Sequence, residues 1–335
     1  ISDAVRRNIE LLRKETTFTI TTAHQPNIFT GPLYFIYKIL HTVKLADHCK
    51  KTYPDYDFVP VFYMGSEDAD FDELGHCWIG GEKLEWDTRQ TGAVGRMKVD
   101  KGLQRIIERI AGQVGVLPYG KDIIRLLKDS FKEGRTLQDA TFSLLDRLFG
   151  ELGLLVLIAD AALLKRQMIP VFSDDLFHQQ ASVLVEKTAA ELDKAGYKVQ
   201  ANPRAINLFY LEEGIRSRIE YKDGQFLVHD TSLRFSKEEI EKELTQHPER
   251  FSPNVILRGL YQETILPNIA FIGGGGEMAY WLQLKDLFAH YKVPYPVLVL
   301  RNSFLVIEDK WKQKIDKTGF GIEDYFKPRQ ELMNQ

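Results

Sequence analysis

The chain has 335 residues, of which 44% are hydrophobic and 27% charged, a composition typical of a globular protein with one large or two modest domains. Its 44 basic and 47 acidic residues give a net charge of −3, which argues against a protein that holds nucleic acid by charge alone. Its two cysteines, Cys49 and Cys77, do not indicate a disulfide scaffold, and no apolar run approaches the roughly 18 residues of a membrane span, so we expect a cytoplasmic protein.

The first part of the chain predicts a strand, a helix and a second strand. Residues 18–24, "FTITTAH", alternate and are rich in threonine, which favours a strand. Apolar residues then recur at helical spacing from Leu33 to Val43, and a second apolar strand, "DFVPVFYM", ends at Met64. Such a β-α-β unit implies a parallel sheet, and parallel sheets bind ligands at the carboxyl ends of their strands.

The next part of the chain predicts a hairpin and a series of helices around one further strand. The hairpin follows Phe71 and turns at Gly80 and Gly81, and residues 100–150 form a helical insertion. Residues 153–160, "GLLVLIAD", predict a buried strand. Residues 172–196 predict one long helix, which Gly196 ends.

The sequence therefore predicts an α/β core in two parts with a parallel sheet. Residues 1–196 form the first part, residues 197–250 a small antiparallel or mixed insertion, and residues 251–310 the second part. Residues 311–335 read as the start of a C-terminal helical region, and we expect this region to be truncated.

Polar residues collect where the first strand ends, in "AHQPNIFTGP". His24 can donate a hydrogen bond to a phosphate or act as an acid or base. A helix that starts between Gly31 and Tyr34 offers free N–H groups to an anion. The alternative is a capped turn with a hydrogen-bonded histidine. We predict that His24 is catalytic and that substrate is bound by Gln25, Asn27, Thr30, Gly31 and Lys38.

Carboxylates collect where the second strand ends, in "MGSEDADFDELGH". Acidic side chains at a spacing of two in an extended chain point the same way, so they can converge on a cation, an amine or a ribose. The alternative is a solvated acidic turn. The spacing of an EF-hand is absent, and we predict no metal ligands. We predict catalytic roles for Glu67, Asp68 and Asp70, and substrate binding by Asp72 and His76.

Four glycines lie between a predicted strand and a predicted helix in "FIGGGGEMAYW". The N–H groups of such a loop can come close to a nucleotide or a sugar. The glycine pattern matches neither GxGxxG nor a P-loop, so the prediction rests on the position of the loop between a strand and a helix. We predict nucleotide binding by Gly273, Gly274, Gly275 and Gly276, and substrate contact by Glu277.

A further predicted helix, in "ILRGLYQETILPN", carries Arg258, Gln262 and Glu263. Arg258 can hold a carboxylate or a phosphate through two parallel hydrogen bonds. We predict substrate binding by Arg258 and Gln262, with an ion pair between Arg258 and Glu263 as the alternative. We expect the corners after both strands and the glycine loop to surround one cavity at the carboxyl edge of the sheet.

Four stretches, "HQPNIFTGPLYFIYK", "PVFYMGSEDADFDELGH", "SPNVILRGLYQETILPN" and "IGGGGEMAYWLQLK", resemble the bacillithiol biosynthesis cysteine-adding enzymes, the BshC family. The resemblance runs from about Thr19 to Asp324. It implies a Rossmann-like core similar to class I aminoacyl-tRNA synthetases, connecting-peptide insertions, and a C-terminal helical coiled coil that forms a homodimer. It also implies a ligase that joins L-cysteine to the amine of glucosaminyl-malate to form bacillithiol.

The resemblance leaves the energy source open, with ATP or ADP and Mg²⁺ as candidate cofactors. Ala69 stands where family members often carry a histidine, so the use of the acidic segment differs here. Two other functions fit the same residues. One is a nucleotidyltransferase that acts on another small metabolite, and the other is a non-catalytic nucleotide-binding partner of a pathway enzyme.

Overall fold

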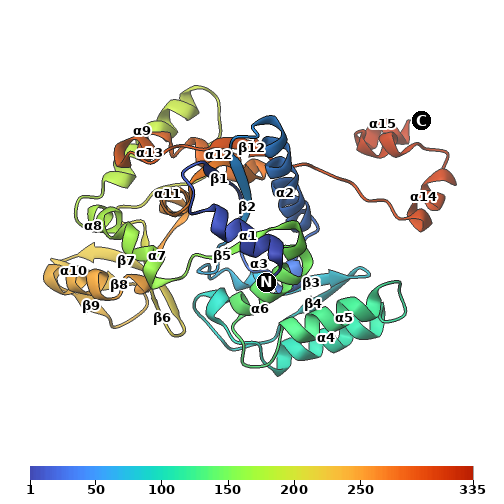
Figure 1. Ribbon diagram of the computed structural model, residues 1–335, viewed down its shortest axis with the longest axis horizontal. Helices are drawn as coiled ribbons and strands as arrows, with labels where there is room; N and C mark the ends of the chain where they lie inside the picture. Colours follow the sequence, from blue (N-terminus) through green and yellow to red (C-terminus); the bar gives the residue numbers. More distant parts are fainter. Residues whose placement is uncertain (335) are drawn as a thin grey trace. The chain divides into compact units, whose positions relative to one another are not determined.

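A five-stranded parallel sheet lies at the centre of the computed structural model, which describes residues 1–334 (Figure 1). Chain order reverses between β1 and β11, as it does between the two halves of a Rossmann sheet, so the carboxyl ends of these strands mark the expected ligand crevice. The predicted α/β class with a parallel sheet is confirmed. In spatial order the strands are β12 (Val297–Leu300), β11 (Asn268–Gly273), β1 (Thr17–His24), β2 (Asp57–Met64) and β5 (Leu155–Ile158).

Helices fill most of the rest of the first compact unit, Ile1–Arg301. None of the helices of residues 1–334 is both long enough and apolar enough to cross a membrane. The helices of this unit are α1 (Asp3–Leu11), α2 (Tyr34–Thr52), α3 (Phe71–Leu74), α4 (Lys101–Val114), α5 (Gly120–Ser130), α6 (Leu137–Phe149), α7 (Ala162–Lys165), α8 (Ile169–Phe177), α9 (Gln180–Lys194), α10 (Lys237–Gln246), α11 (Val255–Ile265), α12 (Gly275–Leu282) and α13 (Lys285–Tyr291). Short 3₁₀ turns are η1 (Ile28–Thr30), η2 (Val94–Arg96), η3 (Gly150–Leu152), η4 (Arg166–Met168) and η5 (Pro248–Arg250).

Both faces of the parallel sheet are covered, because successive side chains of each strand point to opposite faces. On one face, Phe62 of β2 packs with Phe35 of α2 and with apolar residues of α6. On the other face, Tyr63 of β2 and Phe271 of β11 join the largest apolar cluster with α11 and α12. Burial on both faces explains why β2 and β11 read as nearly continuous apolar runs.

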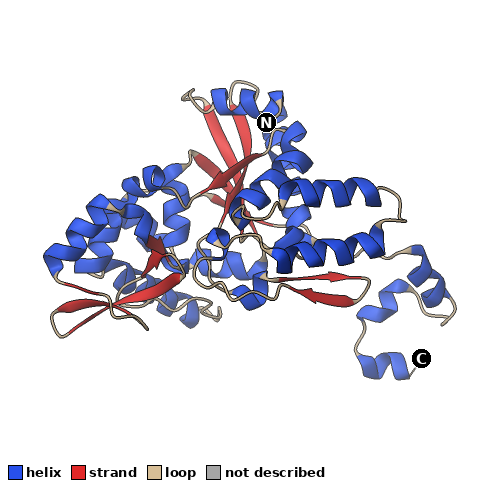
Figure 2. Cartoon of the chain, turned by 90° about the horizontal axis from the view of Figure 1, so that it is seen from below, coloured by secondary structure: helices blue, strands red, loops and turns tan. Residues whose placement is uncertain are grey.

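Two insertions extend to opposite sides of the core sheet (Figures 1 and 2). One contains α4 and α5 beside the hairpin of β3 (His76–Ile79) and β4 (Glu82–Glu85). The other is an antiparallel sheet covered by α10. The hairpin, the helices within residues 100–150 and the antiparallel strands were all predicted. In spatial order, the antiparallel sheet contains β10 (Phe251–Pro253), β6 (Leu208–Glu212), β7 (Ile215–Lys222), β8 (Gln225–Val228) and β9 (Arg234–Phe235).

Two predictions about single elements were wrong. The helix expected over residues 172–196 is two helices, because Gln179, between α8 and α9, adopts the left-handed conformation with a φ of 58°. The strand expected to be buried, β5, is half-buried because it lies at the edge of the sheet.

The chain between β1 and α2 also differs from the prediction. α2 starts at Tyr34, at the end of the predicted range, but Phe29 and Thr30 before it have positive φ angles of 52° and 76°. The N–H groups of Gly31 and Phe35 already donate to backbone carbonyls. The N–H of Gly31, which the sequence had suggested for binding an anion, is therefore not available for it.

The residues from Asn302 onward form a second compact unit. Among its described residues, Phe304, Trp311 and Phe326 are more than half exposed, at 59%, 51% and 74%. A helical region here agrees with the prediction, and the coiled coil stays a prediction. The elements of this unit are α14 (Asp309–Asp316), η6 (Ile322–Phe326) and α15 (Arg329–Met333).

Candidate functional site

Residues at the carboxyl ends of β1, β2 and β11 meet around a cavity of about 680 Å³, which we call the main cavity. Its wall includes residues 23–25 from the first corner, Asp68 from the acidic corner, and residues 274–277 from the glycine loop. α11 adds Arg258, and the antiparallel insertion adds Arg216. The expected meeting of three distant segments around one cavity is confirmed, and the volume is that of a small-molecule site.

Asp68 lies between two arginines on the wall of the main cavity. Its Oδ2 atom is 3.3 Å from Nη1 of Arg258, and its Oδ1 atom is 3.7 Å from Nη1 of Arg216. Nε2 of Gln25 donates a hydrogen bond to Oδ2 at 3.2 Å. Burial by itself would raise the pKa of Asp68, but the two arginines and Gln25 lower it to about 2. Two cations around one carboxylate leave a net positive charge, which suits an anionic ligand.

The pairing of Arg258 with Asp68 argues against the alternative interpretation of Arg258, an ion pair with Glu263. Glu263, the alternative partner, accepts hydrogen bonds from Gln262 at 2.8 Å and Asn268 at 3.0 Å. The alternative ion pair is therefore not formed.

Arg216 reaches the main cavity from β7 of the antiparallel insertion. Its side chain is 7% exposed, and its guanidinium carbon lies 3.8 Å from the centre of the Phe209 ring. Its Nε atom is buried and has no hydrogen-bond partner within residues 1–334. Burial lowers the pKa of Arg216 to about 10, so the group stays charged at neutral pH.

His24 lines the main cavity at the end of β1. Its Nδ1 atom is 3.2 Å from the carbonyl oxygen of Gln25, and its Nε2 atom is 3.4 Å from the hydroxyl of Tyr34. Burial and, next, the charge of Lys38 lower the pKa of His24 to about 4. The imidazole is therefore neutral at pH 7, where it acts as a hydrogen-bonding group rather than a cation.

Lys38 and Glu277 hold the glycine loop in place. Nζ of Lys38 donates to the carbonyl of Ala23 at 2.6 Å and pairs with Oε2 of Glu277 at 2.7 Å. The same carboxylate oxygen accepts the N–H of Gly274 at 2.7 Å. Lys38 is 1% exposed and is not part of the cavity wall. It therefore supports the loop, and the substrate contact predicted for it does not fit this position.

The glycines of the loop differ in their surroundings. Gly274, Gly275 and Gly276 line the main cavity, whereas Gly273 ends β11 in tight packing against Met278. A Cβ atom added to Gly275 or Gly276 would meet no other atom within 4 Å. Packing inside the chain therefore does not require glycine at these two positions, and their backbone is open to a ligand.

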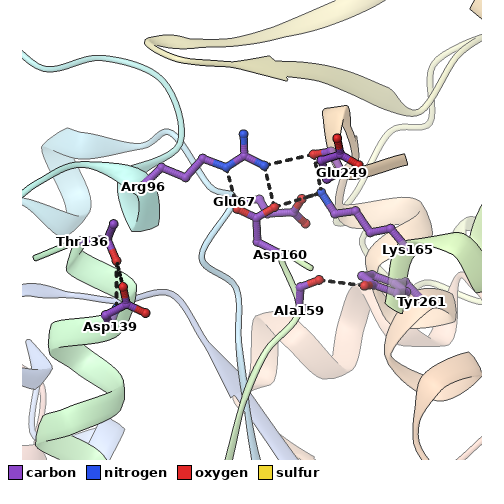
Figure 3. A network of polar contacts seen from close by, with 9 residues as sticks. All are labelled: Glu67, Arg96, Thr136, Asp139, Ala159, Asp160, Lys165, Glu249 and Tyr261. Atoms are coloured by element: carbon purple, nitrogen blue, oxygen red, sulfur yellow. Dashed lines mark hydrogen bonds and ion pairs between the residues drawn. The ribbon is translucent and has the colours of Figure 1, made fainter. Parts of the chain in front are cut away.

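Glu67 belongs to a buried ion-pair network and not to the cavity wall (Figure 3). Its carboxylate pairs with Lys165, which also lies 3.2 Å from Asp160 and donates to the carbonyl of Glu249 at 3.2 Å. Arg96 holds Asp160 through two hydrogen bonds of 2.6 and 2.7 Å. Burial raises the pKa of Glu67 in spite of the neighbouring lysine. This position argues against the catalytic role predicted for Glu67.

Four predicted substrate-binding residues line a second cavity of about 440 Å³ instead. The two cavities share Tyr34 and Glu73 in their walls. The four residues are Asn27, Thr30, Gly31 and His76.

Besides Lys38, Glu67 and Gly273, three further predicted residues line neither cavity. Asp70 and Asp72 are exposed, and Asp70 caps α3 by accepting the N–H of Glu73 at 3.4 Å. Because α3 interrupts the extended chain, the spacing of two no longer makes these carboxylates converge. Gln262 is 2% exposed and faces Glu263 inside the protein.

Sequence reasoning missed Arg204, Arg216 and Arg301, which all line the main cavity. Arg301 directly follows β12, so the rule that ligands bind at the carboxyl ends of strands could have found it. It stacks on the ring of Tyr34, 4.7 Å from the ring centre. Arg204 and Arg216 come from or next to the antiparallel insertion, and no local signal connects them to the core.

Within the part of the chain that the structure describes, no three side chains of histidine, cysteine, aspartate or glutamate are grouped so that they could hold a metal ion. The cavity carboxylates of Asp68 and Glu277 already have cationic partners.

Comparison with known proteins identifies the family. A family model described as "Bacillithiol biosynthesis BshC, N-terminal Rossmann-like domain" matches residues 1–302. The chain belongs to the BshC family. The resemblance found in the four sequence stretches is thus confirmed, and the family's Rossmann-like domain agrees with the strand order of the sheet.

Several curated relatives carry the name "Putative cysteine ligase BshC". The relative from Flavobacterium psychrophilum is 45% identical over 334 residues, which cover 100% of this chain and 62% of the relative. The relative from Cytophaga hutchinsonii is 44% identical over 97% of this chain and 60% of its own length. The relative from Chlorobaculum tepidum is 34% identical over 94% and 58%. The chain thus spans about three-fifths of the length of these BshC proteins.

Proposed function

We propose that the protein that contains this chain is a ligase that joins L-cysteine to the amine of glucosaminyl-malate by an amide bond. The observation that carries the proposal is the arginine-lined main cavity at the point where the strand order of the sheet reverses. The names of the BshC relatives, which describe cysteine ligases, support the same reaction.

The arginines of the main cavity suit the anionic groups of these substrates. Arg258 and Arg216 flank Asp68 and keep one positive charge in excess, which favours a dicarboxylate such as malate. We assign Asp68 the role of fixing both guanidinium groups, because its carboxylate is already paired. This role replaces the catalytic role that the sequence predicted for Asp68.

The glycine loop suits the phosphate of an activated carboxylate. Gly275 and Gly276 open the α12 helix with their backbone exposed to the cavity, and the start of a helix attracts negative charge. ATP is the activating compound that we propose to test first. Arg301 lies next to the loop, with its Nε atom about 3.3 Å from the position that a Cβ of Gly274 would take.

Amide formation makes a bond between the carbonyl carbon of activated cysteine and the amine nitrogen. The bond from that carbon to the oxygen of the activating phosphate breaks, the phosphate leaves with the electron pair, and the nitrogen releases a proton. His24, with a pKa of about 4, is poorly suited to take up this proton. Its one N–H, on Nδ1, faces the carbonyl of Gln25, so its Nε2 atom is free to orient the hydroxyl of Tyr34.

The test uses the full-length protein with glucosaminyl-malate, cysteine and ATP. Mass spectrometry should detect bacillithiol together with AMP or ADP. Absence of a thiol product with every nucleoside triphosphate tried would contradict the ligase.

Two other functions make different predictions. A nucleotidyltransferase for another metabolite should bind ATP in calorimetry with no effect of cysteine. A non-catalytic nucleotide-binding partner predicts that Asp68→Asn and His24→Ala leave cellular bacillithiol unchanged, whereas deletion of the protein lowers it.

We also propose that the full-length protein works in the cytoplasm as a homodimer formed through its C-terminal helical region. Analytical ultracentrifugation of the full-length protein tests the dimer.

A further inference from the structure

The second cavity has no role in the function as described so far. Its wall is built from the chain between β1 and α2, the start of α2, Glu73 of α3 and strand β3, and its volume of about 440 Å³ is large enough for a small ligand. The side chains of Leu33 and Trp78 in this wall are 53% and 61% exposed. They offer an apolar surface that no neighbouring segment of the first compact unit covers fully.

The two cavities differ in charge. Four arginines line the main cavity, whereas no lysine or arginine of the described residues lines the second one. The polar groups of the second cavity are the amide of Asn27, the hydroxyls of Thr30 and Tyr34, the carboxylate of Glu73 and the ring of His76. Neutral hydrogen-bonding groups with one carboxylate next to an exposed tryptophan suit a neutral polyhydroxylated ring or an amine, and not an anion.

Glu73 lies at the border, because it lines both cavities. Its carboxylate forms no ion pair within residues 1–334, in contrast to Asp68 and Glu277 in the main cavity. An acidic group without a cation between two cavities is suited to bind an ammonium group of a ligand that occupies both.

The backbone segment that brings Thr30 into the wall of the second cavity is strained. Phe29 and Thr30 both have positive φ angles, 52° and 76°, which are uncommon for residues other than glycine. Ile28 is fully buried, and the ring of Phe29 packs on Phe131 with their centres 4.9 Å apart. Asn27 is 3% exposed, and its Oδ1 atom has no hydrogen-bond partner in the part of the chain that is described. The fold thus holds this costly conformation in place and presents Thr30 to the second cavity.

We propose that the second cavity binds the hexosamine ring of the acceptor substrate, with Glu73 bound to its ammonium group, while the arginines of the main cavity bind its two carboxylates. This inference rests on the proposed function, since it divides the acceptor of that reaction between the two cavities. In this arrangement, Trp78 covers the apolar side of the ring. The amine lies at Glu73, between the two cavities, and faces the glycine loop of the main cavity.

The test is calorimetric binding to the full-length protein without cysteine or ATP, so no turnover is needed. The three probes are glucosaminyl-malate, its N-acetyl analogue, which lacks the positive charge, and malate alone. Trp78→Ala should weaken both sugar derivatives about tenfold and leave malate unchanged. Glu73→Gln should weaken glucosaminyl-malate about threefold or more and leave the N-acetyl analogue unchanged.

Matched controls separate recognition from folding. Glu133→Gln removes an exposed carboxylate that lines neither cavity, and Trp311→Ala removes an exposed indole from the second compact unit. Both should bind all three probes as the wild type does. The inference would be overturned if Trp78→Ala weakened the binding of malate and of glucosaminyl-malate equally. It would also be overturned if Trp78→Ala and Glu73→Gln both bound glucosaminyl-malate as tightly as the wild type does.

The outcomes for the two proposals differ. If the wild type makes bacillithiol but the cavity variants bind all probes normally, the ligase stands and the sugar subsite is wrong. If the variants lose affinity as expected but no thiol product forms, the subsite stands and the ligase is wrong.

Discussion

Replacing Lys165 with methionine removes one of the two cations that neutralise the buried carboxylates of Glu67 and Asp160. The side chain of Lys165 has no exposed surface, and those of Asp160 and Glu67 are 2% and 9% exposed. Loss of one partner from a buried ion pair typically costs about 3–5 kcal/mol. Because Glu67, Asp160 and the carbonyl of Glu249 all lose this contact, we expect the free energy of unfolding at pH 8 to fall by an amount near the upper end of that range.

The loss should depend on pH. Burial already raises the pKa of Glu67, and without Lys165 it should rise further. A carboxyl group whose pKa is higher in the folded state stabilises the fold below its unfolded pKa and loses that contribution as the pH rises through the folded pKa. Lys165→Met should therefore be closer to the wild type at pH 5, where Glu67 can take up a proton, than at pH 8.

Guanidinium unfolding followed by circular dichroism at both pH values measures the effect. The double variant Glu67→Gln, Lys165→Met should recover much of the lost stability, because it removes the uncompensated charge as well. Arg147→Met breaks an exposed ion pair with Asp129 and should unfold like the wild type. A Lys165→Met variant as stable as Arg147→Met at pH 8, or a double variant no more stable than the single one, would refute the buried pairing.

Three further predictions concern single residues. Burial raises the pKa of Glu263 from 4.5 to about 7, so the wild type should lose roughly 3 kcal/mol of stability as the pH rises through this range. Thermal unfolding should therefore find Glu263→Gln more stable than the wild type at pH 8 but not at pH 4.5. Arg258→Met removes a cation that lowers the pKa of Asp68, so the carboxyl should titrate at higher pH in carbon-13 NMR of labelled aspartate; an unchanged titration would exclude the contact. Gly275→Ala should leave the melting temperature unchanged, because no atom obstructs the new methyl group, but lower ATP affinity in calorimetry about tenfold; normal affinity would remove the loop from the nucleotide site.

The sequence predicted the parts of the fold that depend on local patterns. β1, β2 and the strand before the glycine loop were found because their apolar runs end in sharp polar corners, and such corners gather at one edge of a parallel sheet. The split between α8 and α9 was missed because Gln179 has no sequence signal for its left-handed conformation. Its neighbours continue the helical pattern on both sides.

The candidate site was predicted less completely, for two physical reasons. The chain turns directly after β2, with the N–H of Asp68 donating to the carbonyl of Gly65 at 3.5 Å, and this turn directs Glu67 to Lys165 while Asp68 lines the cavity. Arg216 is 148 residues from Asp68 in the chain, and their contact depends on how the antiparallel insertion packs on the core. Patterns within one segment carry no information about such a contact.

The buried network explains how that distant contact is kept in place. The N–H groups of Val94 and Gly95 donate to the carbonyls of Asp68 and Ser66 at 2.7 and 2.8 Å, so the segment with Arg96 is fixed to the acidic corner. Arg96 and Lys165 both donate to the carbonyl of Glu249, at the end of the antiparallel insertion that carries Arg216. The corner that presents Asp68 and the insertion that presents Arg216 are thus held by the same two cations. Weakening this network should therefore change the affinity of the main cavity for anions even though none of its side chains lines that cavity.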